Sequence, residues 1–152
     1  MERALLWSEA FAVGHRGLDD EHRGLIAAIN ALDAALSGGG KPKRLDAMLG
    51  QLSEAAAAHL AHEDRVLREI KSRSDSYSIE LKAMSLAALN LHLARHERAL
   101  RELDTLLGRE PQQAGVPLAD LPEELRNWFV QHAVKDNAPL KSLFQALEAR
   151  VG

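Results

Sequence analysis

Two short motifs place pairs of possible metal ligands one helical turn apart. They are His59-Leu-Ala-His-Glu63 and His92-Leu-Ala-Arg-His96. Residues four apart on an α-helix lie one above the other on the same face. Each stretch can therefore direct two donor atoms at one point. A histidine–carboxylate pair on one helix and a histidine pair on the next predict part of a metal site, with the rest of the chain as the scaffold that brings the faces together.

Further donors occur at inward positions of other expected helices. His22 belongs to the apolar face of a helix over residues 18–36, and His132 shares a face with Asp136 on a helix over 120–137. A single inward histidine is usually a core residue bonded to a carbonyl. Seven inward donors on four helices do not fit that explanation together, because each unpaired one carries a desolvation cost. The predicted metal ligands are His22, His59, Glu63, His92, His96, His132 and Asp136.

The composition predicts one helical domain. A chain of 152 residues rich in Ala and Leu and poor in aromatics favours helix over sheet. It has no cysteine, which excludes disulfides and thiolate metal sites. A net charge of −3 with mixed signs gives no indication of a nucleic-acid partner. Because no apolar run has the length of a signal peptide or a membrane span, we expect a soluble cytoplasmic protein without a membrane partner.

The hydrophobic periodicity predicts an all-α fold, an antiparallel up-down-up-down four-helix bundle with an N-terminal arm and a short C-terminal helix. Asp19 or Asp20 is expected to cap the first helix. Pro139 should kink or end the fourth helix, because it cannot donate to the carbonyl of Lys135. We expect a single domain over 1–152, with an arm over 1–17, helices over 18–36, 43–73, 78–107 and 120–137, and a tail helix over 139–150.

The donor types narrow the choice of metal. The absence of sulfur disfavours structural zinc, whereas imidazole with carboxylate suits Zn, Fe, Mn, Cu and Ni. Seven donors are too many for one tetrahedral ion and suit two ions about 3.5–4 Å apart. Neutral imidazoles leave less negative charge on the metals than a carboxylate-rich site does. This favours reversible binding of a small ligand over attack on a strong C–H bond.

Five motifs in order along the chain resemble those of a bacterial hemerythrin, and the resemblance covers almost the whole length. The first lies in the expected arm, one falls on each of the first three expected helices, and the last falls on the fourth. They are Trp7-x-x-x-Phe11-x-Val13-Gly14, LDDEH at 18–22 followed by Ile29-Asn30, HLAHE at 59–63, LHLARHE at 91–97, and Trp128-Phe129-x-x-His132.

The resemblance implies a non-haem di-iron centre that binds molecular oxygen reversibly, for storage, delivery or sensing. His92, His96 and His132 would hold one iron. His22 and His59 would hold the other iron and leave an open position for oxygen.

The resemblance also implies that Glu63 and Asp136 bridge the irons, together with an oxo or hydroxo group. Most members of the family place four residues between the last histidine and this aspartate, whereas three separate His132 from Asp136. If Asp136 cannot reach, Glu63 would bridge alone, and the site would be weaker or mononuclear. The positions that match the family's oxygen pocket are Leu60, Leu67, Trp128, Phe129 and Ala133. Leu60 and Ala133 are smaller than usual there, which predicts a roomier pocket.

Two histidines are expected outside the centre. His15 should be exposed in the arm. His62 is turned about 100° from Glu63 on the helix and should face a neighbouring helix or water.

Three functions remain open at this point. The first is reversible oxygen binding without catalysis, which the absence of an extra carboxylate cluster for iron entry favours. The second is a di-iron enzyme acting on nitric oxide, peroxide or ferrous iron. The third is a regulatory or structural module with zinc or a single iron. Nitric oxide and azide are further candidate ligands, and the sequence does not specify a protein partner.

Overall fold

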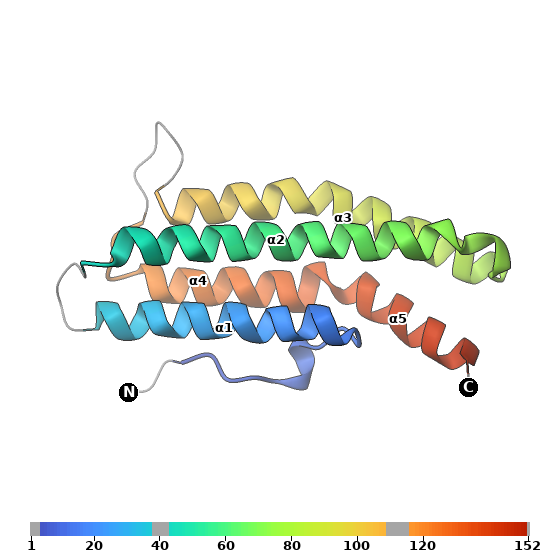
Figure 1. Cartoon of the computed structure of the whole chain (residues 1–152), viewed down its shortest axis with the longest axis horizontal. Coiled ribbons are helices and arrows are strands. Elements are labelled where there is room, and N and C mark those ends of the chain that lie inside the picture. The colour runs from blue at the N-terminus through green and yellow to red at the C-terminus, as the bar shows by residue number, and fades with distance from the viewer. Residues whose placement is uncertain (1–3, 38–42, 109–115, 152) are drawn as a thin grey trace.

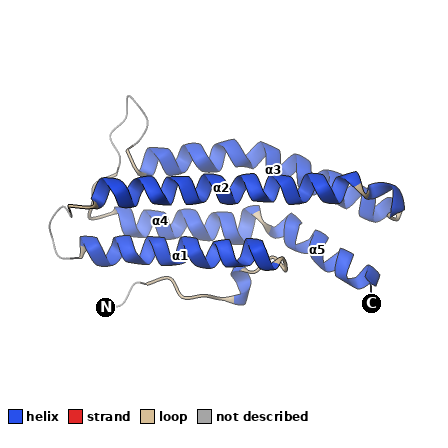
Figure 2. Cartoon of the chain, viewed as in Figure 1, coloured by secondary structure: helices blue, strands red, loops and turns tan. Residues whose placement is uncertain are grey.

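Residues 4–37, 43–108 and 116–151 are described by the computed structural model, and no strand occurs among them (Figure 2). The chain is all-helical, as predicted. The α-helices are α1 (Arg16–Leu36), α2 (Leu45–Ser72), α3 (Ile79–Leu106), α4 (Leu121–Val130) and α5 (Ala138–Val151). The shorter elements are the 3-10 turns η1 (Glu9–Phe11) and η2 (Ser74–Ser76) and the π-helical segment η3 (Gln131–Asp136).

The helices α1 to α4 lie along one another as a bundle (Figure 1). α1 contacts α2 and α4, and α3 contacts α2 and α4, so each helix has two neighbours. The hairpin of α2 and α3 extends beyond α1 at one end, where α5 leaves the line of α4 and packs against α3 (Figure 1). None of the described helices combines the length and the apolar character that a bilayer span requires.

The apolar core forms two clusters, and the predicted ligands lie between them along the helices. On α2, Ala56 belongs to one cluster and Leu67 to the other, with His59 and Glu63 between them. On α1, Leu18 and Leu25 flank His22 in the same way, and on α3 Leu89 and Leu103 flank His92 and His96. The periodic apolar faces thus bring the donors of three helices to one level of the bundle.

The first helix begins two residues earlier than expected and has a different cap. Nδ1 of His15 accepts a hydrogen bond from the backbone N–H of Leu18 at 3.1 Å. The expected cap by Asp19 or Asp20 is therefore wrong. Asp19 instead accepts from the N–H groups of Val13 at 2.7 Å and Gly14 at 3.3 Å, which holds the chain that enters the helix. His15 is also only partly exposed, contrary to the expectation for it.

The segment before α1 runs along that helix and is bonded to it (Figure 1). The N–H of Leu5 donates to Oδ1 of Asn30 at 2.8 Å, and Nδ2 of Asn30 donates to the carbonyl of Leu5 at 2.9 Å. Phe11 is buried, and its ring meets that of Phe129 edge to face at 5.2 Å. These contacts place the carbonyl of Phe11 against the ligand level of the bundle.

The expected helix over 120–137 is in fact α4 followed by η3. The N–H of Asn137 donates to the carbonyl of His132, five residues back, at 3.1 Å. This is the bond of a π-helix, in which each turn contains one extra residue. Pro139 lies in the first turn of α5 and cannot donate to Lys135, so the regular α-helical ladder cannot continue through this point.

Candidate metal centre

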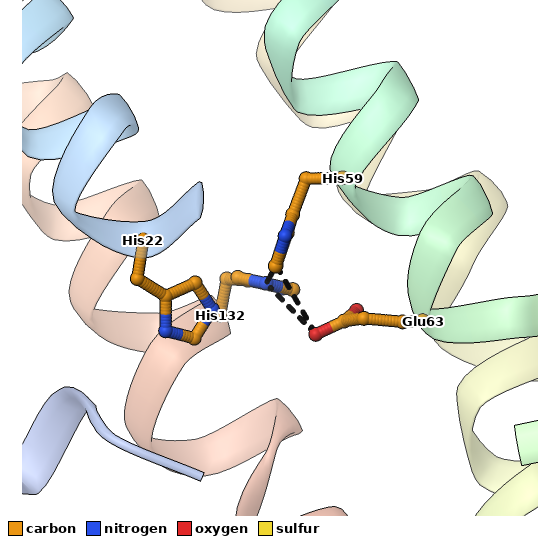
Figure 3. Close-up of side chains that lie close together, drawn as sticks. All are labelled: His22, His59, Glu63 and His132. Atoms are coloured by element: carbon orange, nitrogen blue, oxygen red, sulfur yellow. Dashed lines mark hydrogen bonds and ion pairs between the residues drawn. The ribbon is translucent and has the colours of Figure 1, made fainter. Parts of the chain in front are cut away.

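Four buried side chains from three elements converge at the middle of the bundle (Figure 3). His22 comes from α1, His59 and Glu63 from α2, and His132 from η3. Their ligand atoms all lie within 4.8 Å of one another, and each residue is at most 2% exposed. Figure 3 shows His59, His132 and Glu63 directed toward one point, with His22 beside His132.

The shortest distances in this group centre on one carboxylate oxygen. Oε2 of Glu63 lies 3.2 Å from Nε2 of His59 and 3.6 Å from Nε2 of His132. The two imidazole nitrogens lie 3.1 Å from each other. Two nitrogens and an oxygen in so small a space can act as ligands to a common cation.

Three buried polar atoms at this level have no hydrogen-bond partner among the described residues. They are both carboxylate oxygens of Glu63 and Nε2 of His92. An unpaired buried charge is expensive, and proteins usually compensate it by pairing or by metal coordination. Neutral imidazoles with one carboxylate are also a donor set that zinc, iron and manganese accept. The residues present therefore fit a metal ion.

His92 and His96 lie at the edge of the four-residue group. Nδ1 of His92 is 3.7 Å from Oε1 of Glu63, the oxygen that faces away from the closest imidazole pair. The rings of His92 and His96 are 5.4 Å apart on the same face of α3. The structure thus brings His92 beside Glu63, and leaves His96 one turn further along α3.

Hydrogen bonds from outside the group fix which nitrogen of two histidines faces inward. Nδ1 of His22 lies 2.7 Å from the carbonyl of Phe11, which can only accept, so this nitrogen carries the proton. Nδ1 of His59 lies 2.7 Å from Oε1 of Glu21, a carboxylate on α1, and donates to it in the same way. In both neutral rings the lone pair is then on Nε2, the nitrogen that points into the group.

Glu21 also joins His62 to this arrangement. Its second oxygen lies 2.7 Å from Nδ1 of His62. The sequence predicts that His62 faces a neighbouring helix or water, and in the structure it is part-exposed and bonded to α1. Glu21 was not among the predicted site residues. The available signal was its place within LDDEH, directly before His22.

The profile of the hemerythrin HHE cation-binding domain matches residues 13–144. The chain belongs to the hemerythrin family. No match was found among curated proteins or solved structures. The matched range includes every predicted ligand, and together with the buried His/Glu group it identifies this hemerythrin domain as a metal-binding module.

This hemerythrin does not place Asp136 in the four-residue group. Its Oδ1 is 3.3 Å from Nη2 of Arg98, 3.3 Å from Nε2 of Gln131 and 4.0 Å from Nε of Arg95. The expectation that Asp136 shares the ligand face assumed α-helical spacing. In the π-helical segment the residue one turn after His132 is the fifth, not the fourth, and Asp136 turns toward the arginines of α3.

The residue one π-turn after His132 is Asn137, which was not among the predicted ligands. It is 4% exposed, and its Nδ2 lies 3.2 Å from Nε2 of His22. Because Nδ1 of His22 carries the proton, Nε2 accepts and the Asn137 amide donates. The signal for it was the family's spacing of four intervening residues, which position 137 satisfies with an amide in place of a carboxylate.

Burial and neighbouring charges set the protonation of the hemerythrin site. Burial lowers the pKa of His132 to about 3, only partly opposed by Glu63, and burial also lowers the pKa values of His22 and His92. For Glu63 burial acts to raise the pKa, but His132, His59 and His92 together lower it to about 2. Around neutral pH His22, His92 and His132 are therefore neutral and Glu63 is ionised, the forms in which these groups bind metal. His59 differs, because Glu63 and Glu21 raise its pKa against the effect of burial.

The pocket positions expected from the sequence are all buried in this hemerythrin, but they do not enclose one large space. Trp128 stacks on His132 at 5.9 Å, and Phe129 meets His22 edge to face at 5.6 Å. Ala133 belongs to the cluster around them, whereas Leu67 belongs to the other cluster. The space found beside the ligands has a volume of about 10 Å³ and is lined by Leu60 among others. That is about the volume accessible to one water molecule.

Proposed function

We propose that this hemerythrin domain is a non-haem di-iron protein that binds molecular oxygen reversibly. The observation that supports this proposal is the state of Glu63. Its carboxylate is 0% exposed, is surrounded by His59, His132 and His92, and has no hydrogen-bond partner among the described residues. An ionised carboxylate with both oxygens free is suited to bridging two cations.

The remaining ligands of the proposal come from both sides of Glu63. His22 and His59 would hold one iron, and His92, His96 and His132 would hold the other. An oxo or hydroxo group would complete the bridge. Iron bound there would supply the redox chemistry that oxygen binding requires.

The protein orients the histidine ligands and excludes water from them. Phe11 and Glu21 hold the protons of His22 and His59 on Nδ1, which leaves the lone pair of each neutral ring on Nε2, toward the centre. In the absence of metal, Nε2 of His22 accepts a hydrogen bond from Asn137. The stacked ring of Trp128 fixes the plane of His132, and its Nε1 donates to the carbonyl of Ala99 at 2.9 Å. Phe129 and Leu60 are nearly or fully buried and exclude water from the ligands. Water exclusion slows the side reactions that would end reversible binding.

We propose binding rather than enzymatic turnover as the main role. In the four-residue group of the described structure, Glu63 is the single carboxylate, and the other members are imidazoles. Such a site does little to stabilise the high oxidation states that oxidative catalysis uses. The protein partner would determine whether the bound oxygen serves storage, delivery or sensing.

The proposal is tested by loading the protein with ferrous iron under anaerobic conditions and then admitting oxygen. Two irons per chain and a charge-transfer absorption that disappears when oxygen is removed and returns with it would support the proposal. Azide added to the oxidised protein provides a second spectroscopic probe. Glu63→Ala is the negative control, since it should lose the absorption. One zinc per chain without colour, or rapid turnover of nitric oxide or peroxide, would contradict reversible oxygen binding as the function.

A further inference from the structure

Asn137 is a neutral side chain at a buried position beside the ligands. It lies in contact with His22, just after η3 and beside the four-residue group, and its side chain is a neutral amide. The adjacent carboxylate, Asp136, lines the small space beside Glu63 and His132, but its Oδ1 is bonded to Arg98 and Gln131, so the arginine offsets its charge. Glu63 is consequently the single carboxylate in that group.

The charge of two bound ions is therefore poorly compensated. A pair of divalent cations carries four positive charges, and Glu63 offsets one of them. A single bound ion would leave less positive charge uncompensated. In a buried site of low effective dielectric constant, charges a few ångströms apart interact strongly, so the second cation enters against the field of the first.

We propose that Asn137 makes the two ions of this centre bind with unequal affinity, one tightly and one weakly. This inference rests on the proposed metal-binding function and goes beyond it. Asn137 is a specificity-determining residue here, because a carboxylate in its place would contribute a negative charge beside both ions. The amide contributes a hydrogen bond to His22 and no charge.

Asn137→Asp tests the proposal directly. Protein stripped with a chelator is titrated anaerobically with ferrous iron in a calorimeter, and the iron retained after desalting is counted by elemental analysis. The unaltered protein should retain one iron per chain and bind the second weakly. Asn137→Asp should retain two, with the second bound about tenfold or more tightly than in the unaltered protein.

Asp136→Asn is the matched control, because it removes a carboxylate from the neighbouring position. Since Asp136 is paired with arginines, this variant should bind both ions as the unaltered protein does. Circular dichroism checks that the Asn137→Asp protein folds. Asn137→Ala provides a second test. It exchanges one neutral side chain for another, so the affinity for the second ion should stay low.

The outcomes separate the inference from the function on which it rests. Two ions bound with equal affinity by the unaltered protein would overturn the role of Asn137, and so would loss of the second ion in Asp136→Asn or tight binding of it in Asn137→Ala. A protein that binds no iron at all would instead overturn the proposed function.

Discussion

Glu21 on α1 accepts a hydrogen bond from Nδ1 of His59 on α2 at 2.7 Å. A carboxylate behind a metal-binding histidine fixes its tautomer and its orientation, and raises its strength as a ligand. The same carboxylate bonds His62, so α1 and α2 are joined at the level of the centre by one side chain.

Glu21→Gln should weaken metal binding by about 10- to 100-fold, because the amide cannot hold the His59 proton as a carboxylate does. The measurement is an anaerobic iron titration of the stripped protein. Asp20→Asn is the matched control, since Asp20 is exposed and pairs with Arg23 on the same helix. Equal affinities for Glu21→Gln and the unaltered protein would show that Glu21 does not position His59.

Glu63→Ala should remove at least one of the two irons, because it removes the carboxylate placed between His59, His132 and His92. An anaerobic titration with ferrous iron gives the number of ions bound at saturation. The control is Glu69→Ala, on the same helix but with a side chain that is 63% exposed. Two bound irons at saturation and an unchanged oxygen spectrum in Glu63→Ala would argue against any bridging role.

Trp128→Phe should lower the free energy of unfolding by about 1–3 kcal/mol, because it removes a buried hydrogen bond and alters an aromatic stack. The bond runs from Nε1 to the carbonyl of Ala99, and the stack is on His132. Chemical denaturation of the stripped protein measures this change without any contribution from metal. Trp7→Phe is the control, since Trp7 is part-exposed and its Nε1 makes an exposed contact of 3.4 Å. An unchanged free energy of unfolding in Trp128→Phe would mean that neither feature of Trp128 stabilises the fold.

The stripped protein should lose stability as the pH falls from about 6.5 toward 3. The pKa of His132 is about 3 in the folded protein, against an ordinary value of 6.5, so between these pH values the unfolded chain binds more protons. The contribution of His132 to the free energy of unfolding is complete above about pH 6.5 and is lost as the pH falls toward 3. Burial shifts His22 and His92 in the same direction, and Glu63 adds to the loss below its ordinary value of 4.5. His59 opposes them, because its pKa is raised, despite burial, by Glu63 and Glu21.

Urea unfolding at about pH 7.5 and pH 5 measures this dependence, and His132 alone predicts a loss on the order of 2 kcal/mol at the lower pH. His132→Gln should show a smaller difference between the two conditions. A stripped protein that is more stable at the lower pH would contradict the sign of the effect.

Local spacing made much of the centre predictable. His59 with Glu63 and His92 with His96 share helix faces because four residues make about one turn, and that geometry holds wherever the helix forms. The all-helical fold was equally predictable, since apolar residues at helical spacing are buried together only when helices pack against one another. His22 and His132 could be assigned to inward faces for the same reason, and the structure brings them together with His59 and Glu63.

The set of helical faces and the donors on them could be read from the residue spacing alone. Which residue follows His132 into the centre is set by the packing of the folded chain. The choice between Asp136 and Asn137 depends on the π-helical turn before Pro139, whose hydrogen bonds skip one residue. The contact between Glu21 and His59 also depends on tertiary packing, since the two lie 38 residues apart and meet only when α1 packs on α2. Spacing along one helix is a local property, whereas the register between helices is set by the packing of the whole core.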